Sequence, residues 1–247
     1  MNFKFVLHLS FMALPFFYSE EITTDSIQLM LNEETSKHVV QVLRMKNGEQ
    51  LNLTDGKGNL FTTAIIDDHK KKCTVKILST YYHQPSEKKV TIAISLVKNA
   101  SRFEWFLEKA TEIGVNEIIP LICERTEKQH FRFDRMKGIL VSAMLQSQQC
   151  WLPVLGEPVR FDDLVIRQFE DEKKYIAHCL PEGNKESLHL QISKSPNQLI
   201  LIGPEGDFST TEIELAIRHH IIPVTLGDTR LRTETAGLVA ATLLCLS

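Results

Sequence analysis

The chain of 247 residues has few cysteines and no excess of charge of either sign. Lysine and arginine total 28 and aspartate and glutamate total 31, so the formal net charge is −3. The overall basic character of many nucleic-acid-binding proteins is absent, and any site for a polyanion has to be local. The five cysteines include no CxxC pair, which argues against a disulfide framework and a structural zinc site. We expect them to be small buried hydrophobic residues in a reducing compartment, the cytoplasm.

The motifs of several common enzyme classes are missing as well. The sequence has no GxGxxG after its first strand pattern, no GxxxxGK[ST], no GxSxG and no HExxH. The usual signatures of Rossmann-type hydride transfer, nucleotide hydrolysis, esterase chemistry and zinc proteolysis are therefore absent. We expect no metal site.

The amino terminus resembles a signal peptide, because Lys4 precedes an apolar stretch within residues 1–19. Polar residues and a proline interrupt this stretch, and it is too short to span a membrane. No small-x-small cleavage site precedes the polar turn that follows it. We therefore favour a strand over residues 14–18 with a short extension before it, and Met12 is an alternative start.

Residues 1–82 show the pattern of a small β-barrel. A helical segment is expected at residues 33–44, with Val39, Val40 and Leu43 on one face. Around it, alternating hydrophobicity and turn residues predict strands at residues 50–53, 60–66 and 73–78. The polar, proline-containing residues 83–89 are expected to be a linker.

Residues 90–247 alternate between strand and helix patterns. Strands are expected at residues 90–96, 117–122, 175–179, 199–202 and 224–226. Helices are expected at residues 103–113, 133–151, 210–219 and 234–246. This alternation predicts an α/β fold with a parallel sheet covered by helices on both faces.

Two loops that directly follow predicted strands have an unusual composition. The first, LIGPEGDFS over residues 201–209, brackets a proline with two glycines, so its backbone is able to approach a ligand closely. The second, residues 226–236, places two arginines and a carboxylate before the last helix. Taken alone, each loop is equally consistent with a ligand-binding loop and with a tight turn followed by a helix cap. Ligands of open parallel sheets bind beyond the carboxyl ends of strands, so the pair indicates a binding site.

These loops carry a family resemblance. IGPEG at residues 202–206 and LG-x4-RTETA at residues 226–236 resemble the RsmE family of 16S ribosomal RNA uridine-N3 methyltransferases, of the SPOUT or α/β-knot class. Further matches are KATEIGV at residues 109–115, ERT at residues 124–126, Gln146-Ser147 and, in the first domain, His38, residues 42–44 and Asp55-Gly56. The resemblance covers the chain from Met12 onward.

The resemblance implies a PUA-like β-barrel followed by a trefoil-knotted methyltransferase domain, S-adenosylmethionine as cofactor and a working homodimer. The chain departs from the family pattern at three places. Asp207 stands where the family usually has a second glycine, Gln149 lies near a usual arginine, and Arg230 follows Thr229, where the arginine usually stands.

The resemblance also suggests roles for individual residues. The implied cofactor-binding residues are Leu201, Ile202, Gly203, Pro204, Glu205, Gly206, Leu226, Gly227, Leu231, Arg232, Thr235 and Ala236. Arg232 is the candidate for stabilising negative charge on the uracil oxygens. Glu205 or Glu234 is the candidate general base, or alternatively a carboxylate that only fixes Arg232 in place. Glu234 is equally well interpreted as a first-turn carboxylate that the dipole of the last helix favours.

RNA contacts are expected from two groups of residues. In the second domain the candidates are Lys98, Arg102, Arg125, Lys128, Arg132 and Arg135, and in the barrel they are His38 and Arg44. Each of these charged side chains is also consistent with an ordinary solvated surface residue. A cluster of them would neutralise RNA phosphates and thereby supply affinity for RNA.

The predicted function is methylation of uridine N3 in 16S ribosomal RNA of the small subunit, without any membrane or metal partner. One alternative is a non-catalytic RNA-binding protein of ribosome assembly that retains the fold. Another is a Rossmann-like enzyme that binds a different nucleotide at residues 203–206.

Overall fold

A computed structural model describes residues 14–127, 129–167, 172–180, 185–192 and 195–246. The expectations for residues 1–13, including a start at Met12, lie outside these residues. The chain forms two compact units that divide between His83 and Gln84. Each unit has its own sheet and its own core.

The first unit is a five-stranded sheet in the order β1-β3-β4-β5-β2. The strands are β1 (Phe16–Tyr18), β2 (Gln28–Met30), β3 (Gln50–Thr54), β4 (Asn59–Asp67) and β5 (Thr74–Tyr82). Among the pairings described for this first sheet, β1 and β3 run parallel and all the others are antiparallel. Alternate residues of β3 and β4, such as Leu51, Leu53 and Phe61, are fully buried and form the core of this unit.

The helix expected at residues 33–44 consists of two shorter pieces. α1 (Glu33–Lys37) begins at Asn32, whose side chain accepts a hydrogen bond from Thr35 N at 2.8 Å, and continues into the π-helix η1 (His38–Val42). The wider π turn, closed by Leu43 N on His38 O, leaves Leu43 42% exposed, so the predicted face of this helix is wrong at that position.

The second unit contains a parallel sheet in the order β11-β13-β10-β12-β6-β7-β8, with β9 also paired to β7. Its strands are β6 (Lys89–Ser95), β7 (Glu117–Ile122), β8 (Val154–Leu155), β9 (Val159–Arg160), β10 (Glu172–Ala177), β11 (Glu186–Ser187), β12 (Asn197–Ile202) and β13 (Ile222–Thr225). The parallel sheet confirms the predicted α/β fold of this unit.

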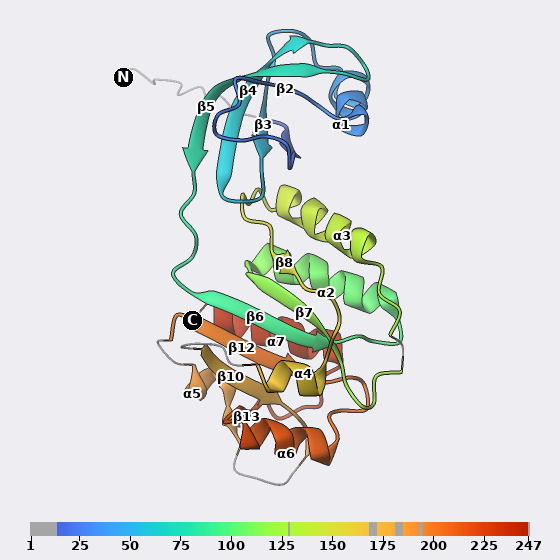
Figure 1. Cartoon of the computed structure of the whole chain (residues 1–247), viewed down its shortest axis with the longest axis vertical. Coiled ribbons are helices and arrows are strands. Elements are labelled where there is room, and N and C mark those ends of the chain that lie inside the picture. Colours follow the sequence, from blue (N-terminus) through green and yellow to red (C-terminus); the bar gives the residue numbers. More distant parts are fainter. Residues whose placement is uncertain (1–13, 128, 168–171, 181–184, 193–194, 247) are drawn as a thin grey trace, which may run out of the picture. The chain divides into compact units, whose positions relative to one another are not determined.

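Helices cover both faces of this sheet (Figure 1). Along β12, Ile200 and Ile202 pack toward one face and Leu199 and Leu201 toward the other, because successive side chains of a strand alternate. The first face is covered by α2 (Ala100–Ile113), α3 (Phe133–Gln146), α5 (Leu188–Gln191) and α7 (Thr233–Cys245). The second face is covered by α4 (Phe161–Val165) and α6 (Thr210–Arg218).

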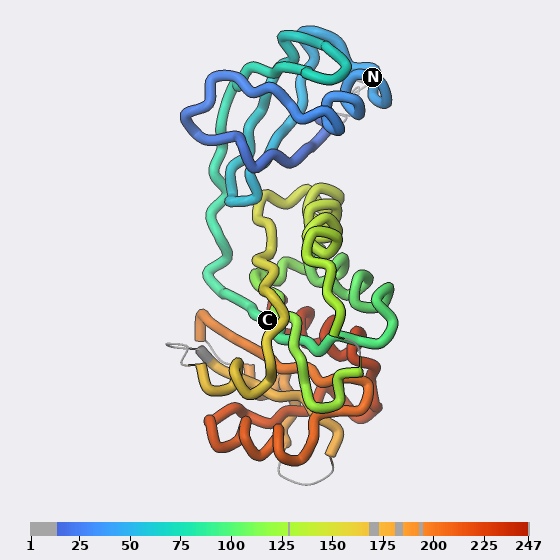
Figure 2. The backbone as a smooth tube through the Cα atoms, turned by 45° about the vertical axis from the view of Figure 1, so that its right-hand side comes forward, coloured from blue at the N-terminus to red at the C-terminus, as the bar shows by residue number. Residues whose placement is uncertain are grey.

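The last helix returns to the middle of the unit. α7 packs against α2 and β6, and Figure 2 shows this carboxy-terminal segment in red beside the green segment of α2. The close approach depends on Gly237, because a Cβ atom there would lie 2.7 Å from Ile94 Cδ1 and 2.8 Å from Phe106 Cε2. The beginning of α7 is thereby fixed near the carboxyl ends of the strands.

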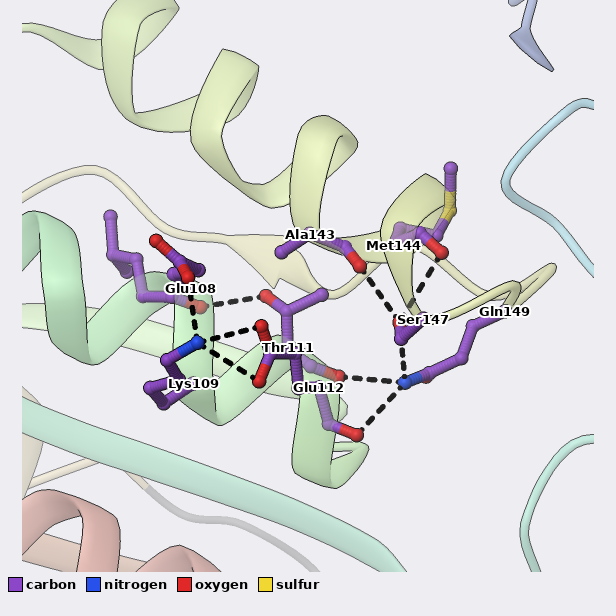
Figure 3. Close-up of polar contacts among 9 residues, drawn as sticks. Glu108, Lys109, Thr111, Glu112, Ala143, Met144, Ser147 and Gln149 are labelled. Carbon is purple, nitrogen blue, oxygen red and sulfur yellow. Dashed lines mark hydrogen bonds and ion pairs between the residues drawn. The ribbon is translucent and has the colours of Figure 1, made fainter. Parts of the chain in front are cut away.

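α2 and α3 are joined by polar contacts at their carboxyl ends (Figure 3). The Gln149 side-chain amide donates hydrogen bonds to the carbonyl oxygens of Thr111 and Glu112 at 3.0 and 3.1 Å, which caps the last turn of α2. α3 ends at Gln146, so the helix predicted to reach residue 151 is too long. Gln148 adopts a φ of 55°, which an α-helix does not accommodate.

The cysteines are mostly but not uniformly buried. Cys73, Cys123 and Cys150 are buried, as expected, whereas Cys245 is partly buried and Cys179 is exposed. The expectation of five buried thiols is therefore wrong for Cys179, which lies just beyond β10. Among the described residues, no helix is long and apolar enough to cross a bilayer, and no group of three or more candidate ligands surrounds a metal position.

Candidate functional site

Two adjoining cavities lie at the carboxyl ends of β10, β12 and β13. The larger has a volume of about 370 Å³ and the smaller about 260 Å³. Both are lined by Ala177, Cys179, Arg230, Leu231 and Ala236, so they form neighbouring parts of one site. This is the edge of an open parallel sheet at which ligands bind.

Most residues proposed for cofactor binding line these cavities. They are Ile202, Gly203, Pro204, Glu205, Arg232, Leu226, Gly227, Leu231 and Ala236. Leu201, Gly206 and Thr235 do not line them. Leu201 is fully buried on the face of β12 that packs under α4 and α6, and the backbone of Gly206 faces the Arg125 side chain.

Sequence reasoning missed the contribution of β10 to the site. His178, Cys179 and Lys185 line the larger cavity, and Arg230 lines both. The available signal was the position of the first two at the carboxyl end of a predicted parallel strand, which places them at the same sheet edge as the glycine loop.

The loop after β12 owes its shape to tight packing and to Asp207. A Cβ atom on Gly203 would lie 3.1 Å from the buried Phe208 ring, so the space that glycine leaves is filled by this ring. Asp207 has a φ of 65°, a left-handed conformation that aspartate tolerates better than most residues. Its Oδ2 accepts a hydrogen bond from Cys179 N at 2.8 Å, and its Oδ1 accepts one from Phe208 N at 2.8 Å. Asp207 thus ties the loop to the end of β10.

The neighbouring strand ends hold the same loop from the other side. Glu205 Oε1 accepts a hydrogen bond from Lys98 N, beyond β6, at 2.9 Å. Arg125 Nη1, beyond β7, donates to Gly206 O at 2.7 Å and to Phe208 O at 3.4 Å. The buried Glu212 carboxylate accepts from Glu124 N and Ser209 N, both at 2.8 Å, and completes a capping box with Ser209 at the start of α6.

The second loop meets the first through a threonine. Thr233 Oγ1, in the first turn of α7, donates a hydrogen bond to Gly203 O at 2.9 Å. Gly227 has a φ of 133°, a conformation that other residues rarely adopt. Arg232 precedes α7 as its N-cap residue, is exposed and lines the smaller cavity. The two loops are therefore one connected framework around the cavities.

The two candidate general bases differ in accessibility. Glu205 is exposed and lines both the smaller cavity and an adjoining shallow depression beside Lys98 and Arg102. Glu234 is 7% exposed, and its Oε1 lies 3.6 Å from Arg102 Nε. Glu234 Oε2 is buried and has no hydrogen-bond partner in the part of the chain that the structure describes. Of the two, Glu205 lines the smaller cavity and Glu234 lines neither cavity.

The cluster of positive charge predicted for RNA is largely engaged within the chain. Lys98 Nζ lies 2.8 Å from Glu127, and this pairing raises the pKa of Lys98. Arg135 holds the Glu104 carboxylate with two nitrogens, at 2.6 and 2.9 Å, which lowers the pKa of Glu104. Arg102 faces Glu234 and Arg125 faces the glycine loop, as described above. Lys128 lies outside the described residues.

Arg132 differs from these cations. It is the exposed N-cap residue of α3, and in the described part of the chain no carboxylate lies within ion-pair distance of it. In the first unit, Arg44 and His38 are both exposed, and the His38 ring meets Phe17 edge to face with centroids 5.5 Å apart. These three side chains are the most available of the predicted RNA contacts.

His178 brings a buried imidazole to the larger cavity. It is 8% exposed, and its Nδ1 is buried without a hydrogen-bond partner among the described residues. Burial lowers the pKa of His178, and the ammonium group of Lys185 lowers it further, whereas Asp207 opposes the shift. The neighbourhood therefore favours the uncharged ring.

Comparison with known proteins places this site in a family. Residues 84–245 match the model of an RNA methyltransferase domain, and residues 31–78 match that of an RNA methyltransferase PUA domain. The ribosomal RNA small subunit methyltransferase E of Synechocystis is 32% identical over 209 residues, which are 82% of this chain and 68% of that protein.

Solved structures agree with these matches. A "probable rRNA-methyltransferase" from Porphyromonas gingivalis superposes with a TM-score of 0.86 at 36% identity, over 94% of this chain and 99% of the other. The ribosomal RNA small subunit methyltransferase E of Neisseria gonorrhoeae, bound to S-adenosyl methionine, has a TM-score of 0.81 at 28% identity, over 92% and 95% of the two chains. The chain therefore belongs to the ribosomal RNA small subunit methyltransferase E family of RNA methyltransferases.

Proposed function

We propose that this protein transfers a methyl group from S-adenosylmethionine to N3 of a uridine in 16S ribosomal RNA. The observation that carries the proposal is the pair of loops that encloses the adjoining cavities at the ends of β10, β12 and β13. The S-adenosyl methionine bound by the Neisseria relative supports the choice of cofactor. The names of the curated relatives support the choice of RNA.

The residues of the site fit this cofactor. Main-chain groups of residues 203–205 and 226–227 are available to the edge of an adenine ring, and Leu226, Leu231 and Ala236 supply apolar contacts. Such a combination of apolar walls and a few fixed polar groups is typical of small-molecule sites. When bound, S-adenosylmethionine supplies a methyl group already activated by its sulfonium.

The protein then has to align the acceptor and manage one proton. Uracil N3–H is a weak acid whose pKa lies above neutrality, so the nitrogen becomes a good nucleophile only as its proton leaves. Glu205, with its accessible carboxylate, accepts this proton. With the cofactor bound, the N3 lone pair would form the bond to the methyl carbon as the bond from that carbon to the sulfonium sulfur breaks, which would leave S-adenosylhomocysteine. Lys98 N–H fixes one carboxylate oxygen of Glu205 and thereby its orientation. Glu234 holds Arg102 instead.

Arg232 stabilises the charge that develops on the uracil oxygens. Its exposed side chain starts at the rim of the smaller cavity, next to the Thr233 hydroxyl that joins both loops. A cation at this point acts on the transition state more than on the bound substrate, because the negative charge on the uracil oxygens develops as the N3 proton leaves.

The decisive experiment compares Arg232→Ala with Arg132→Ala on purified small subunits that lack the modification. Mass mapping of wild-type reactions should locate one methylated uridine. Arg232→Ala should bind S-adenosylhomocysteine and RNA within a few-fold of wild type and react about 10²–10³ times more slowly. Arg132→Ala should bind RNA more weakly, with a flatter salt dependence, and turn over normally at saturating RNA.

Two results would contradict this assignment. RNA binding by the wild-type protein without any methylation would favour the non-catalytic assembly protein. Full turnover by Arg232→Ala at saturating RNA, with only its RNA affinity reduced, would make Arg232 an RNA contact rather than a catalytic residue.

Several finer features belong to the same proposal. We infer a trefoil knot of the SPOUT class in residues 90–247, supported by the motifs at residues 202–206 and 226–236.

A homodimer is supported by three partly exposed apolar residues of α7, which are Leu238, Val239 and Leu243. Light scattering at micromolar concentration would detect this dimer. Residues 1–82 act as the RNA-binding PUA-like domain and residues 83–89 as the linker. The substrate and the absence of paired cysteines support a cytoplasmic location.

A further inference from the structure

Arg125 has a different environment from the other predicted RNA contacts. Lys98, Arg102 and Arg135 each face a carboxylate, whereas Arg125 Nη1 donates to two main-chain oxygens of the glycine loop. These oxygens belong to Gly206 and Phe208, which flank Asp207. A single guanidinium nitrogen therefore spans the turn in which Asp207 holds its left-handed conformation.

The stem of Arg125 also packs on the loop. A Cβ atom added to Gly206 would lie 3.3 Å from Arg125 Cδ and 3.5 Å from Arg125 Cβ. Glycine at this position lets the arginine cross the loop closely. This contact explains why Gly206 lines neither cavity although it belongs to the IGPEG motif.

The base of Arg125 is itself held in place. Thr126 Oγ1 accepts a hydrogen bond from Cys123 N at 2.8 Å and shares another with Ser95 Oγ at 2.9 Å. Glu124 N donates to the buried Glu212. The ERT sequence at residues 124–126 thus joins the end of β7 to β6, to α6 and to the glycine loop.

We infer that Arg125 is a positioning residue for the cofactor: it clamps residues 206–208 so that Gly203, Pro204 and Glu205 keep the shape that lines the smaller cavity. This inference rests on the proposed cofactor site. Of the hydrogen bonds described for this loop, only those of Arg125 reach two of its carbonyl groups from one donor atom. Substitution of Arg125 changes none of the residues that line the two cavities and removes only the restraint on the backbone of this loop.

The test uses the full-length protein and three variants. Arg125→Met keeps an unbranched stem over Gly206 but has no donor. Arg125→Lys keeps the charge and one donor group but lacks the planar fork. Arg160→Met is the matched control, because Arg160 is an exposed arginine on β9 that lines neither cavity of the site. Calorimetry with S-adenosylhomocysteine and RNA titrations at several salt concentrations are recorded well below the melting temperature.

The clamp predicts a specific order of affinities. Arg125→Met should bind S-adenosylhomocysteine about tenfold or more weakly, because charge-assisted hydrogen bonds are lost from the loop. Arg125→Lys should fall between Arg125→Met and wild type, and Arg160→Met should match wild type. The KM for S-adenosylmethionine should rise more than kcat falls. RNA affinity and the slope of its salt dependence should stay unchanged in Arg125→Met.

Other results overturn the inference. Unchanged S-adenosylhomocysteine affinity in Arg125→Met, with or without weaker RNA binding, would show that Arg125 does not position the cofactor loop. If Arg125→Met does not fold, Arg125→Lys decides, and wild-type cofactor affinity in that variant overturns the clamp. Failure of the wild-type protein to bind S-adenosylhomocysteine would instead overturn the proposed cofactor site, and the clamp with it.

Discussion

Asp207 shows how one residue compensates for its own backbone conformation. Its φ of 65° is one that glycine adopts without cost, yet its carboxylate accepts hydrogen bonds from Cys179 N and Phe208 N. The strain of the left-handed backbone is thus offset by a link between β10 and the glycine loop. This link accounts for the departure from the second glycine usual in the family.

We predict that Asp207→Ala is more harmful than Asp207→Gly, and that Asp207→Asn is intermediate between wild type and Asp207→Ala. Alanine loses both hydrogen bonds, which should cost about 1–3 kcal/mol of unfolding free energy, and it tolerates this φ less well than aspartate. Glycine also loses both hydrogen bonds but adopts this φ without strain, whereas asparagine tolerates the φ and keeps one of the two acceptor oxygens. Urea unfolding of the three variants checks the order. A stabilised Asp207→Gly protein would show that the link to Cys179 contributes nothing.

The burial of His178 predicts how the free energy of unfolding depends on pH. Burial keeps its pKa in the folded protein below the ordinary value of about 6.5, so the unfolded chain binds a proton more readily. The contribution of His178 to stability is present above about pH 6.5 and is lost as the pH falls below it. The slope of unfolding free energy against pH between 5 and 7 should flatten in His178→Asn.

The control for this pH dependence is His189→Asn, because His189 is exposed on α5. That variant should keep more of the slope than His178→Asn does. Equal slopes in wild type and His178→Asn would show that His178 titrates alike in both states.

For single residues, the sequence predicts where a side chain lies in the fold better than it predicts which other residue that side chain contacts. The glycine loops were predictable because strands of a parallel sheet end at the same edge, which brings Gly203 and Gly227 together. The pairing of Arg102 with Glu234 was not predictable, since it depends on how α7 lies beside α2. For the same reason Arg125 reads as an RNA contact in the sequence and lies on the glycine loop in the structure.

Among the elements, α7 is the one whose position the site depends on most directly. Its first turn carries the Thr233 hydroxyl that bonds to Gly203 O, and Gly237 one turn later lies against β6 and α2. A shift of the helix away from β6 would therefore move the end of one loop against the other.

Gly237→Ala should destabilise the protein although alanine favours helices. Its Cβ would approach Ile94 Cδ1 within 2.7 Å, and overpacking of this kind costs about 1–3 kcal/mol, against a gain of about 1 kcal/mol in helix propensity. Gly138→Ala in α3 is the matched control, because a Cβ there meets nothing within 4 Å and should stabilise the protein. Thermal unfolding distinguishes the two. A Gly237→Ala protein as stable as Gly138→Ala would mean that α7 does not pack this closely.

The elements themselves were largely predictable, and their ends were not. Hydrophobic periodicity located α2, α6 and α7 because each buries one face or most of its surface. The end of α3 at Gln146 depends on tertiary contacts instead, since the chain turns at Gln148 so that Gln149 caps α2 (Figure 3). Periodicity carries no information about such a cap.

In the molecule as a whole, the two units have separate cores. The core of the first consists of residues between Phe17 and Ile77, among them Ile22, Phe61 and Val75. The two cores on either face of the second sheet begin at Val90. Among the described residues, no residue belongs to the cores of both units, and a hydrophobic core of its own is what an independently folding domain requires.

This separation predicts the behaviour of a fragment of residues 84–247. The fragment should fold and bind S-adenosylhomocysteine within a few-fold of the full chain, since both cavities and all the loop contacts lie within it. It should bind RNA at least about tenfold more weakly and with a smaller salt slope, because His38, Arg44 and the other cations of the first unit are gone. Calorimetry and RNA titration, with circular dichroism to verify folding, measure both. RNA affinity equal to that of the full chain would contradict the role proposed for the first unit, whereas a folded fragment without cofactor affinity would show that the first unit helps to form the cofactor site.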